Sequence, residues 1–212
     1  MKIRAIHAHQ LCASTVFAVI LALSGCALPL PDKPVRPEPY DLGPALARPE
    51  APATALAPVA MSTVESPAAI DGTAVIYRLM YTASGQQPRP YAQARWTMSP
   101  PQLVTQRLRE GLSAVRPVVE PGAGLAAIEL RAELDEFSQV FAAPDASEGV
   151  VQLRVTATAP GVRTGRLLGQ RTFTVRQSAP TPDAAGGVRA LRAATDETVK
   201  QVVAWVNGLV LP

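Results

Sequence analysis

The chain has 212 residues, 48% of them hydrophobic, with 20 basic and 17 acidic side chains and a formal net charge of +3. A net charge this small argues against two classes of protein, those that bind nucleic acid through a basic surface and those that bind membranes through a polybasic segment. The length is sufficient for one domain with a substantial hydrophobic core.

The N-terminus has the pattern of a signal peptide. Lys2 and Arg4 form a short positive region, and an uncharged, mostly apolar run follows from about Leu11 to Leu23. A run of this length fits the hydrophobic region of a signal peptide and is too short to span a bilayer as a helix. We therefore expect residues 1–25 to be removed on export.

The apolar run ends in a lipobox. Its residues are Leu23, Ser24, Gly25 and Cys26. The small side chains of Ser24 and Gly25 let a peptidase close over the scissile bond, and the thiol of Cys26 then carries diacylglycerol while its freed amine is acylated. Several acyl chains on one residue anchor a protein firmly without a transmembrane helix. An ordinary secretory signal, with a cysteine at this position by chance, is the alternative.

Cleavage before Cys26 changes the chemical inventory. His7, His9 and Cys12 leave with the signal peptide, so the mature chain has no histidine and its only cysteine is acylated. Removing the two basic residues of the signal leaves 18 basic against 17 acidic side chains. Imidazole and thiolate are the usual transition-metal ligands and the usual partners in nucleophilic catalysis. We therefore expect no metal site, no cofactor and no enzymatic activity.

A proline-rich tether follows the cysteine. Prolines alternate with other residues from Ala27 to Pro39, a composition typical of polyproline II, although plain disorder is also compatible with it. An extended spacer of this length would hold a domain roughly 40 Å from the lipid surface. The expected organisation is a signal peptide (1–25), a lipidated cysteine with its tether (26–39) and a periplasmic domain (40–212).

The first half of that domain predicts strands and then a helix. Strands are expected at Tyr40–Leu42, weakly within Leu56–Val64, at Thr73–Tyr81 and at Pro90–Trp96, on the basis of β-branched and aromatic content. Ser99, followed by two prolines and Gln102, has capping-box spacing and predicts a helix to about Val115. Its apolar stripe would hold Leu103, Val104, Leu108 and Leu112, with Arg107, Arg109 and Glu110 outside.

The second half predicts three alternating strands and a last helix. Apolar residues alternate with polar ones over 128–135, 151–158 and 172–176, and a break at Asp135-Glu136-Phe137 suggests a bulge. The last helix has Leu191, Val199, Val202, Val206 and Leu209 at helical spacing. The expected fold is α+β: a twisted, mainly antiparallel sheet packed in two layers against two helices.

Several motifs in this order are similar to a known family. They are the lipobox, the proline-rich spacer, Asp71-Gly72, Ile76-Tyr77-Arg78, Tyr91-Ala92 through Trp96, and Pro100-Pro101-x-Leu103 with its Leu/Arg helix. Together they resemble the ABC-type transport auxiliary lipoprotein family, the Pqi-type lipoproteins associated with MCE (mammalian cell entry) lipid-transport systems.

The resemblance implies a non-catalytic envelope component that works with an MCE-domain protein and the subunits of an ABC transporter. It leaves homo-oligomerisation open. Ala27, rather than aspartate, follows the lipidated cysteine, which favours the periplasmic face of the outer membrane over that of the inner membrane. Two other functions remain open: a structural or regulatory lipoprotein of another envelope assembly (a synthase activator or secretion component), and a lipid carrier that acts alone.

Candidate contact residues cluster in two strands that are expected to pair. Arg78, Tyr91, Arg95 and Trp96 are of the types enriched in binding hot spots, although cross-strand packing explains tyrosine and tryptophan equally well. The acidic row Glu129, Glu133 and Asp135 suggests glycosidase-like carboxylates. A solvated strand face explains that row better.

Overall fold

The computed structural model describes residues 35–46, 56–161 and 165–211. Apart from Val35, the described residues belong to one unit, which runs from Arg36 to Pro212. The predicted signal peptide, the lipobox and most of the tether lie outside the described residues. In chain order the elements are β1 (Glu38–Tyr40), β2 (Val59–Met61), β3 (Ala74–Leu79), β4 (Arg89–Trp96), α2 (Pro100–Ser113), β5 (Val118–Val119), β6 (Ile128–Ala143), β7 (Ala146–Ala159), β8 (Arg166–Ser178) and α3 (Ala184–Asn207).

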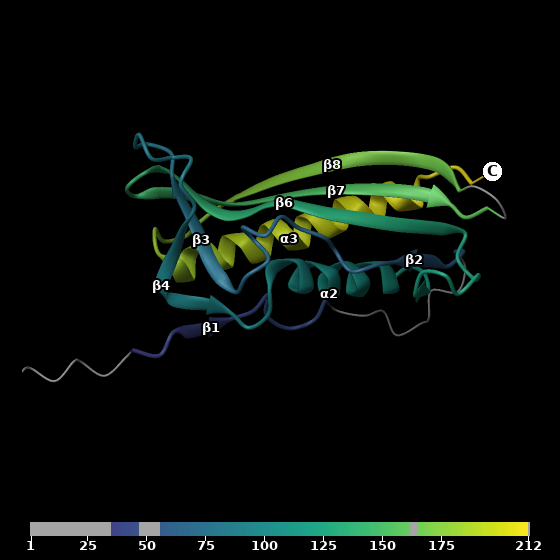
Figure 1. Cartoon of the computed structure of the whole chain (residues 1–212), viewed down its shortest axis with the longest axis horizontal. Coiled ribbons are helices and arrows are strands. Elements are labelled where there is room, and N and C mark those ends of the chain that lie inside the picture. The colour runs from purple at the N-terminus through teal and green to yellow at the C-terminus, as the bar shows by residue number, and fades with distance from the viewer. Residues whose placement is uncertain (1–34, 47–55, 162–164, 212) are drawn as a thin grey trace, which may run out of the picture. The chain divides into compact units, whose positions relative to one another are not determined.

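The eight strands of the described ranges join one mixed sheet around β6 (Figure 1). One edge of β6 pairs antiparallel with β7, which in turn pairs antiparallel with β8. The other edge pairs parallel with β2 at Ile128 to Leu130 and parallel with β3 at Gln139 to Phe141. β4 pairs antiparallel with β3 on one side and parallel with β1 on the other. The long ladders are thus antiparallel, as expected, and the short strands add parallel pairs at their margin.

The alternating sequence of β6 and β7 has the expected structural effect. Val151, Leu153, Val155 and Ala157 of β7 are buried, and the residues between them are half exposed. The β6–β7 register shifts between Leu134 and Glu136, which makes Asp135 the extra residue of a bulge. This shift confirms the break predicted from the sequence.

Both helices cover the same face of the sheet, with α3 crossing beneath β6, β7 and β8 and α2 beside it (Figure 1). At the start of α2, the backbone N–H of Ser99 donates to Oε1 of Gln102 over 3.2 Å. At the start of α3, the Asp183 carboxylate accepts the N–H of Gly186 over 2.7 Å. Such caps satisfy backbone donors that have no partner within the helix. The predicted two-layer α+β fold is confirmed.

The core lies between the two layers. Its largest fully buried side chains include Phe137, Phe173, Leu134, Leu153 and Leu191. Gly149 lets β7 approach α3 closely, because a Cβ atom there would lie 2.5 Å from the backbone nitrogen of Leu191. No helix in the described ranges is long and apolar enough to cross a membrane.

Four details differ from the sequence-based expectation. The first strand is Glu38–Tyr40 rather than Tyr40–Leu42. Strand β5 was not predicted from the sequence, because two residues are too few to show a periodic pattern. Leu209 follows the end of α3 instead of lying within it. Arg107, expected outside α2, is only 3% exposed, because two carboxylates and two backbone carbonyls surround its guanidinium.

Candidate partner-docking site

The end of the β3–β4 hairpin brings aromatic rings together. The rings of Tyr77 and Tyr91 lie 4.6 Å apart between centroids, and Phe141 of β6 meets Tyr77 edge-on at 6.0 Å. Such pairs stabilise a sheet beyond the apolar area that they bury. Met80 and Tyr81, just beyond β3, are 54% and 45% exposed. The hairpin therefore has a packed aromatic base and an exposed apolar tip.

Tyr91 is held by a buried polar chain. Its hydroxyl donates to Oε1 of Gln139 over 2.8 Å, and Nε2 of Gln139 donates to Oγ of Ser147 over 2.8 Å. Gln139 is fully buried, so these bonds satisfy an amide that water does not reach. Burial raises the pKa of Tyr91 to about 12, with a smaller effect from Tyr77. Tyr91 also lines a hollow of about 360 Å³ at the start of α3.

Arg95 binds its own strand. Its Nη1 donates to the carbonyl oxygens of Tyr91 and Ala94, the latter over 2.8 Å. Arg95 is half-buried, and among the described residues its guanidinium forms hydrogen bonds through Nη1.

Arg78 lies in a second hollow, of about 520 Å³, on the sheet face away from the helices. Its Nε lies 3.4 Å from Oε2 of Glu136, and its Nη1 donates to the carbonyl of Gln86 over 3.4 Å. Val140 and Val150 also line this hollow. Arg78 thus joins the β3–β4 loop to β6.

Trp96 lies in the core. It is 3% exposed and meets Phe137 edge-on at 5.5 Å. We therefore assign Trp96 to core packing, the second of its two interpretations. The structure thus separates the four candidates. Arg78 and Tyr91 line different hollows, Arg95 donates to the backbone carbonyl of Tyr91, and Trp96 is buried.

The acidic row on β6 forms part of a charge network across the sheet. Nη2 of Arg154 lies 2.7 Å from Glu133 and 3.0 Å from Asp135. A shared arginine partner explains these two carboxylates without a catalytic role. Within the described residues, no group of three or more histidine, cysteine or acidic side chains is placed to hold a metal ion.

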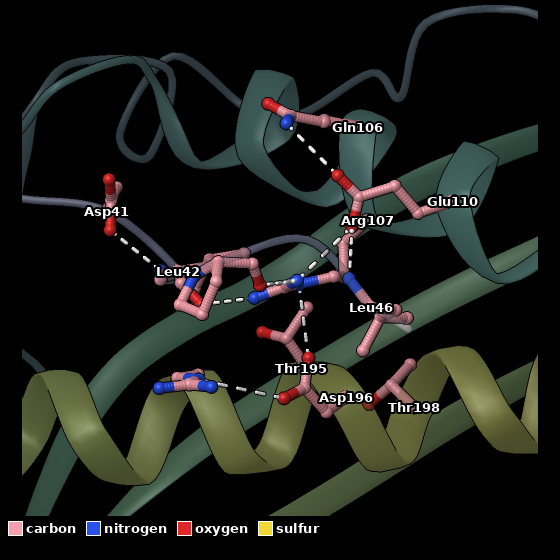
Figure 2. A network of polar contacts seen from close by, with 12 residues as sticks. Asp41, Leu42, Leu46, Gln106, Arg107, Glu110, Thr195, Asp196 and Thr198 are labelled. Atoms are coloured by element: carbon pink, nitrogen blue, oxygen red, sulfur yellow. Dashed lines mark hydrogen bonds and ion pairs between the residues drawn. The ribbon is translucent and has the colours of Figure 1, made fainter. Parts of the chain in front are cut away.

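Sequence reasoning missed a polar cluster around Arg107, which joins the start of the domain to both helices (Figure 2). Nη1 of Arg107 donates to the carbonyl of Pro44 over 2.8 Å, and Nη2 donates to the carbonyl of Leu42. Nε lies 3.1 Å from Oδ1 of Asp196 on α3, and Nη1 lies 3.2 Å from Oε2 of Glu110. We call these five residues the Arg107 clamp.

Two further bonds extend the clamp. Oε2 of Glu110 accepts the backbone N–H of Leu46 over 3.2 Å, and Arg192 approaches Asp196 at 3.8 Å. Desolvation by burial raises the pKa of Asp196, although Arg107 and Arg192 oppose the change. The segment after β1 is therefore fixed to α2 and α3 by its backbone carbonyls and an N–H. The clamp was detectable in the sequence, because Arg107 is four residues after Leu103 and three after Val104, on the apolar stripe of the helix.

The fold matches solved structures at low sequence identity. A Xanthomonas campestris protein of the DUF330 family has a TM-score of 0.66 at 15% identity, covering 80% of this chain and 94% of its own. An uncharacterised protein has a TM-score of 0.63 at 16% identity, with coverages of 81% and 99%. A hypothetical protein from Chlamydia trachomatis has a TM-score of 0.52 at 12% identity, with coverages of 73% and 98%. No curated protein sequence matches this chain.

These matches define an α+β domain of one recurring fold. The family model described as ABC-type transport auxiliary lipoprotein component matches residues 40–203, from the last residue of β1 almost to the end of α3. The chain belongs to this family of auxiliary lipoproteins of ABC-type transport systems. The resemblance noted in the sequence is thereby confirmed.

Proposed function

We propose that this protein is a lipid-anchored, non-catalytic component of an MCE-type system that moves lipid between membranes. The observation that carries the proposal is the family match over residues 40–203, which begins where the proline-rich tether ends. An auxiliary role leaves ATP hydrolysis and transport to partner subunits, which suits a domain built around a packed core.

Membrane attachment follows from the lipobox. Cys26 would carry the lipid, and Ala27 after it favours the periplasmic face of the outer membrane, with the inner membrane as the alternative. The tether would then enter the domain through β1.

The Arg107 clamp supports this arrangement mechanically. A three-residue strand that pairs with β4 alone among the described strands is a weak attachment by itself. The buried guanidinium adds hydrogen bonds to Leu42 and Pro44, directly after β1, and links them to α3 through Asp196. These bonds would transmit tension from the anchor to both helices, so that β1 would not detach from the sheet under load.

The docking surface for an MCE-domain partner would be the β3–β4 hairpin. Its tip exposes Met80 and Tyr81, and Arg78 lies next to the tip at the end of β3. Tyr91 and Arg95 lie further along β4. Exposed apolar and aromatic side chains next to arginine are the composition of protein-binding hot spots.

Crosslinking the membrane-anchored protein in intact cells, followed by mass spectrometry of the co-purified proteins, tests this proposal. Recovery of an MCE-domain protein is expected with the wild type, and a clear loss is expected with Arg78→Ala/Arg95→Ala. The matched control is Arg131→Ala/Lys200→Ala, since both side chains are highly exposed (68% and 81%). Thermal unfolding of each variant verifies that the domain is intact. Recovery of a peptidoglycan synthase or a secretion component instead would contradict the proposal.

A further inference from the structure

The free edge of β8 differs from the other ends of the sheet. β1 has three residues and contains Pro39, which lacks an N–H, and β5 has two residues. Short strands and prolines are the usual means by which a sheet avoids pairing with another chain. β8, in contrast, has 13 residues and pairs only with β7 among the described elements.

Beneath β8, two large apolar side chains that pack against the core remain partly exposed to solvent. Trp205 of α3 meets Phe173 edge-on at 5.9 Å, and it lies close to Gly169, where a Cβ atom would be 3.3 Å from its ring. Trp205 and Leu209 pack against the core but remain half exposed. An additional strand beside β8 would cover these side chains.

The charge of the edge is of one sign. β8 contains Arg166, Arg171 and Arg176 and no acidic residue. Arg176 approaches Glu148 of β7 at 3.6 Å, and the guanidinium of Arg171 lies 5.1 Å above the Phe173 ring. Arg166 and Arg171 are exposed and form no ion pair with any described residue.

Two simpler occupants of this edge are a second copy of β8 and another segment of this chain. Charge argues against the first, and proline content argues against the second. Two β8 strands side by side would bring the arginines of both together, and like charges on paired strands are destabilising. Residues 27–34 and 47–55, which lie outside the described residues, contain several prolines, and prolines cannot donate to a ladder. An acidic extended segment of another protein could form backbone hydrogen bonds with the edge of β8 and ion pairs with its arginines.

We propose that the edge of β8 binds an extended, acidic segment of a partner protein by strand addition. Backbone hydrogen bonds to β8 supply affinity in this mode of recognition, and the side chains supply specificity. Acidic side chains of the segment would pair with Arg166 and Arg171, and apolar ones would cover Trp205. Arg176 lines the hollow that contains Arg78, but Arg166, Arg171 and Trp205 do not, so the inference does not depend on the proposed docking partner.

The test uses the full-length protein and a blocked synthetic peptide of repeated Thr-Glu-Val triplets with the length of β8. Binding is measured by fluorescence anisotropy, and the affected amides are identified by hydrogen exchange. We expect the peptide to slow exchange along β8, and a version with lysine in place of glutamate to bind at least about tenfold more weakly. Arg166→Glu/Arg171→Glu should lose the acidic peptide and gain the lysine version.

The matched control is Arg189→Glu/Lys200→Glu, which makes the same charge change on α3 and should bind like the wild type. The proposal is overturned if the acidic peptide does not bind, or if the charge reversal leaves its binding unchanged. It is also overturned if the protein self-associates and Arg166→Glu/Arg171→Glu abolishes that association, because the occupant would then be a second copy.

Discussion

Arg107 of α2 and Asp196 of α3 form an ion pair, with Nε and Oδ1 3.1 Å apart, beneath the segment that follows β1. The arginine is 3% exposed and the aspartate 31%, so the pair lies at the margin of the core. It is one of the contacts that connect the start of the domain to its last helix.

Replacing Arg107 with alanine should strongly destabilise the protein. The change leaves Asp196 and Glu110 without their shared cation and two backbone carbonyls without a donor, and breaking a buried pair in this way costs roughly 3–5 kcal/mol. Urea denaturation measures the loss. Arg131→Ala, at a highly exposed site, should change the free energy of unfolding by less than about 0.5 kcal/mol. A loss no larger than this for Arg107→Ala would mean that the clamp has no structural role.

The carboxyl of Asp196 should give the stability a distinct pH dependence. Burial raises the pKa of Asp196 in the folded protein above its ordinary value of 3.8, so between the two values the folded state binds more protons than the unfolded state. Its contribution to stability is therefore fully present below 3.8 and is lost as the pH rises through the folded pKa. Unfolding free energies of wild type and Asp196→Asn, compared across this window, should differ in slope, with the more negative slope in the wild type. Parallel curves would contradict the assignment.

Gly149→Ala should disrupt the contact between β7 and α3. The new Cβ would lie 2.5 Å from the nitrogen of Leu191 and 2.6 Å from the carbonyl carbon of Ala190, and backbone atoms cannot rotate away. Overpacking of this kind typically costs about 1–3 kcal/mol. Gly72→Ala is the control, because no atom lies within 4 Å of its Cβ position. Equal melting temperatures for the two variants would show that the layers are less tightly packed than described.

Tyr91→Phe should destabilise the fold while preserving the ring. The change leaves Oε1 of the buried Gln139 without its donor, and an unsatisfied buried acceptor costs roughly 1–3 kcal/mol. Tyr81→Phe removes a hydroxyl from a residue that is 45% exposed and should be nearly neutral in chemical denaturation. If both variants unfold at the same denaturant concentration, the polar chain through Gln139 contributes no stability.

The fold was predictable from the sequence to the extent that its pattern is local. Alternation in β7 identifies a strand with one buried face, and Ser99 with two prolines identifies the start of a helix. The parallel pairing of β2 and β3 with a single edge of β6 was not predictable, because it joins residues far apart in the chain and leaves no periodic signal.

The candidate site was predictable only in part. Arginine and tryptophan suggest contact residues by type, but type does not distinguish the exposed hairpin tip from the core position of Trp96. Arg107 was assigned to solvent because arginine is rarely buried, whereas its place on the apolar stripe of α2 indicated the opposite. Its partners Leu42, Pro44 and Asp196 were not predictable in the same way, because they lie far from Arg107 in the chain.

The most direct test of the account is the mass of the N-terminal peptide of the protein extracted from membranes. We expect a peptide that begins at Cys26 and carries diacylglycerol and an N-linked acyl chain, with Cys26→Ser remaining uncleaved and unmodified. A mature N-terminus at another residue, or an unmodified Cys26, would contradict the claim that this auxiliary component works from a lipid anchor.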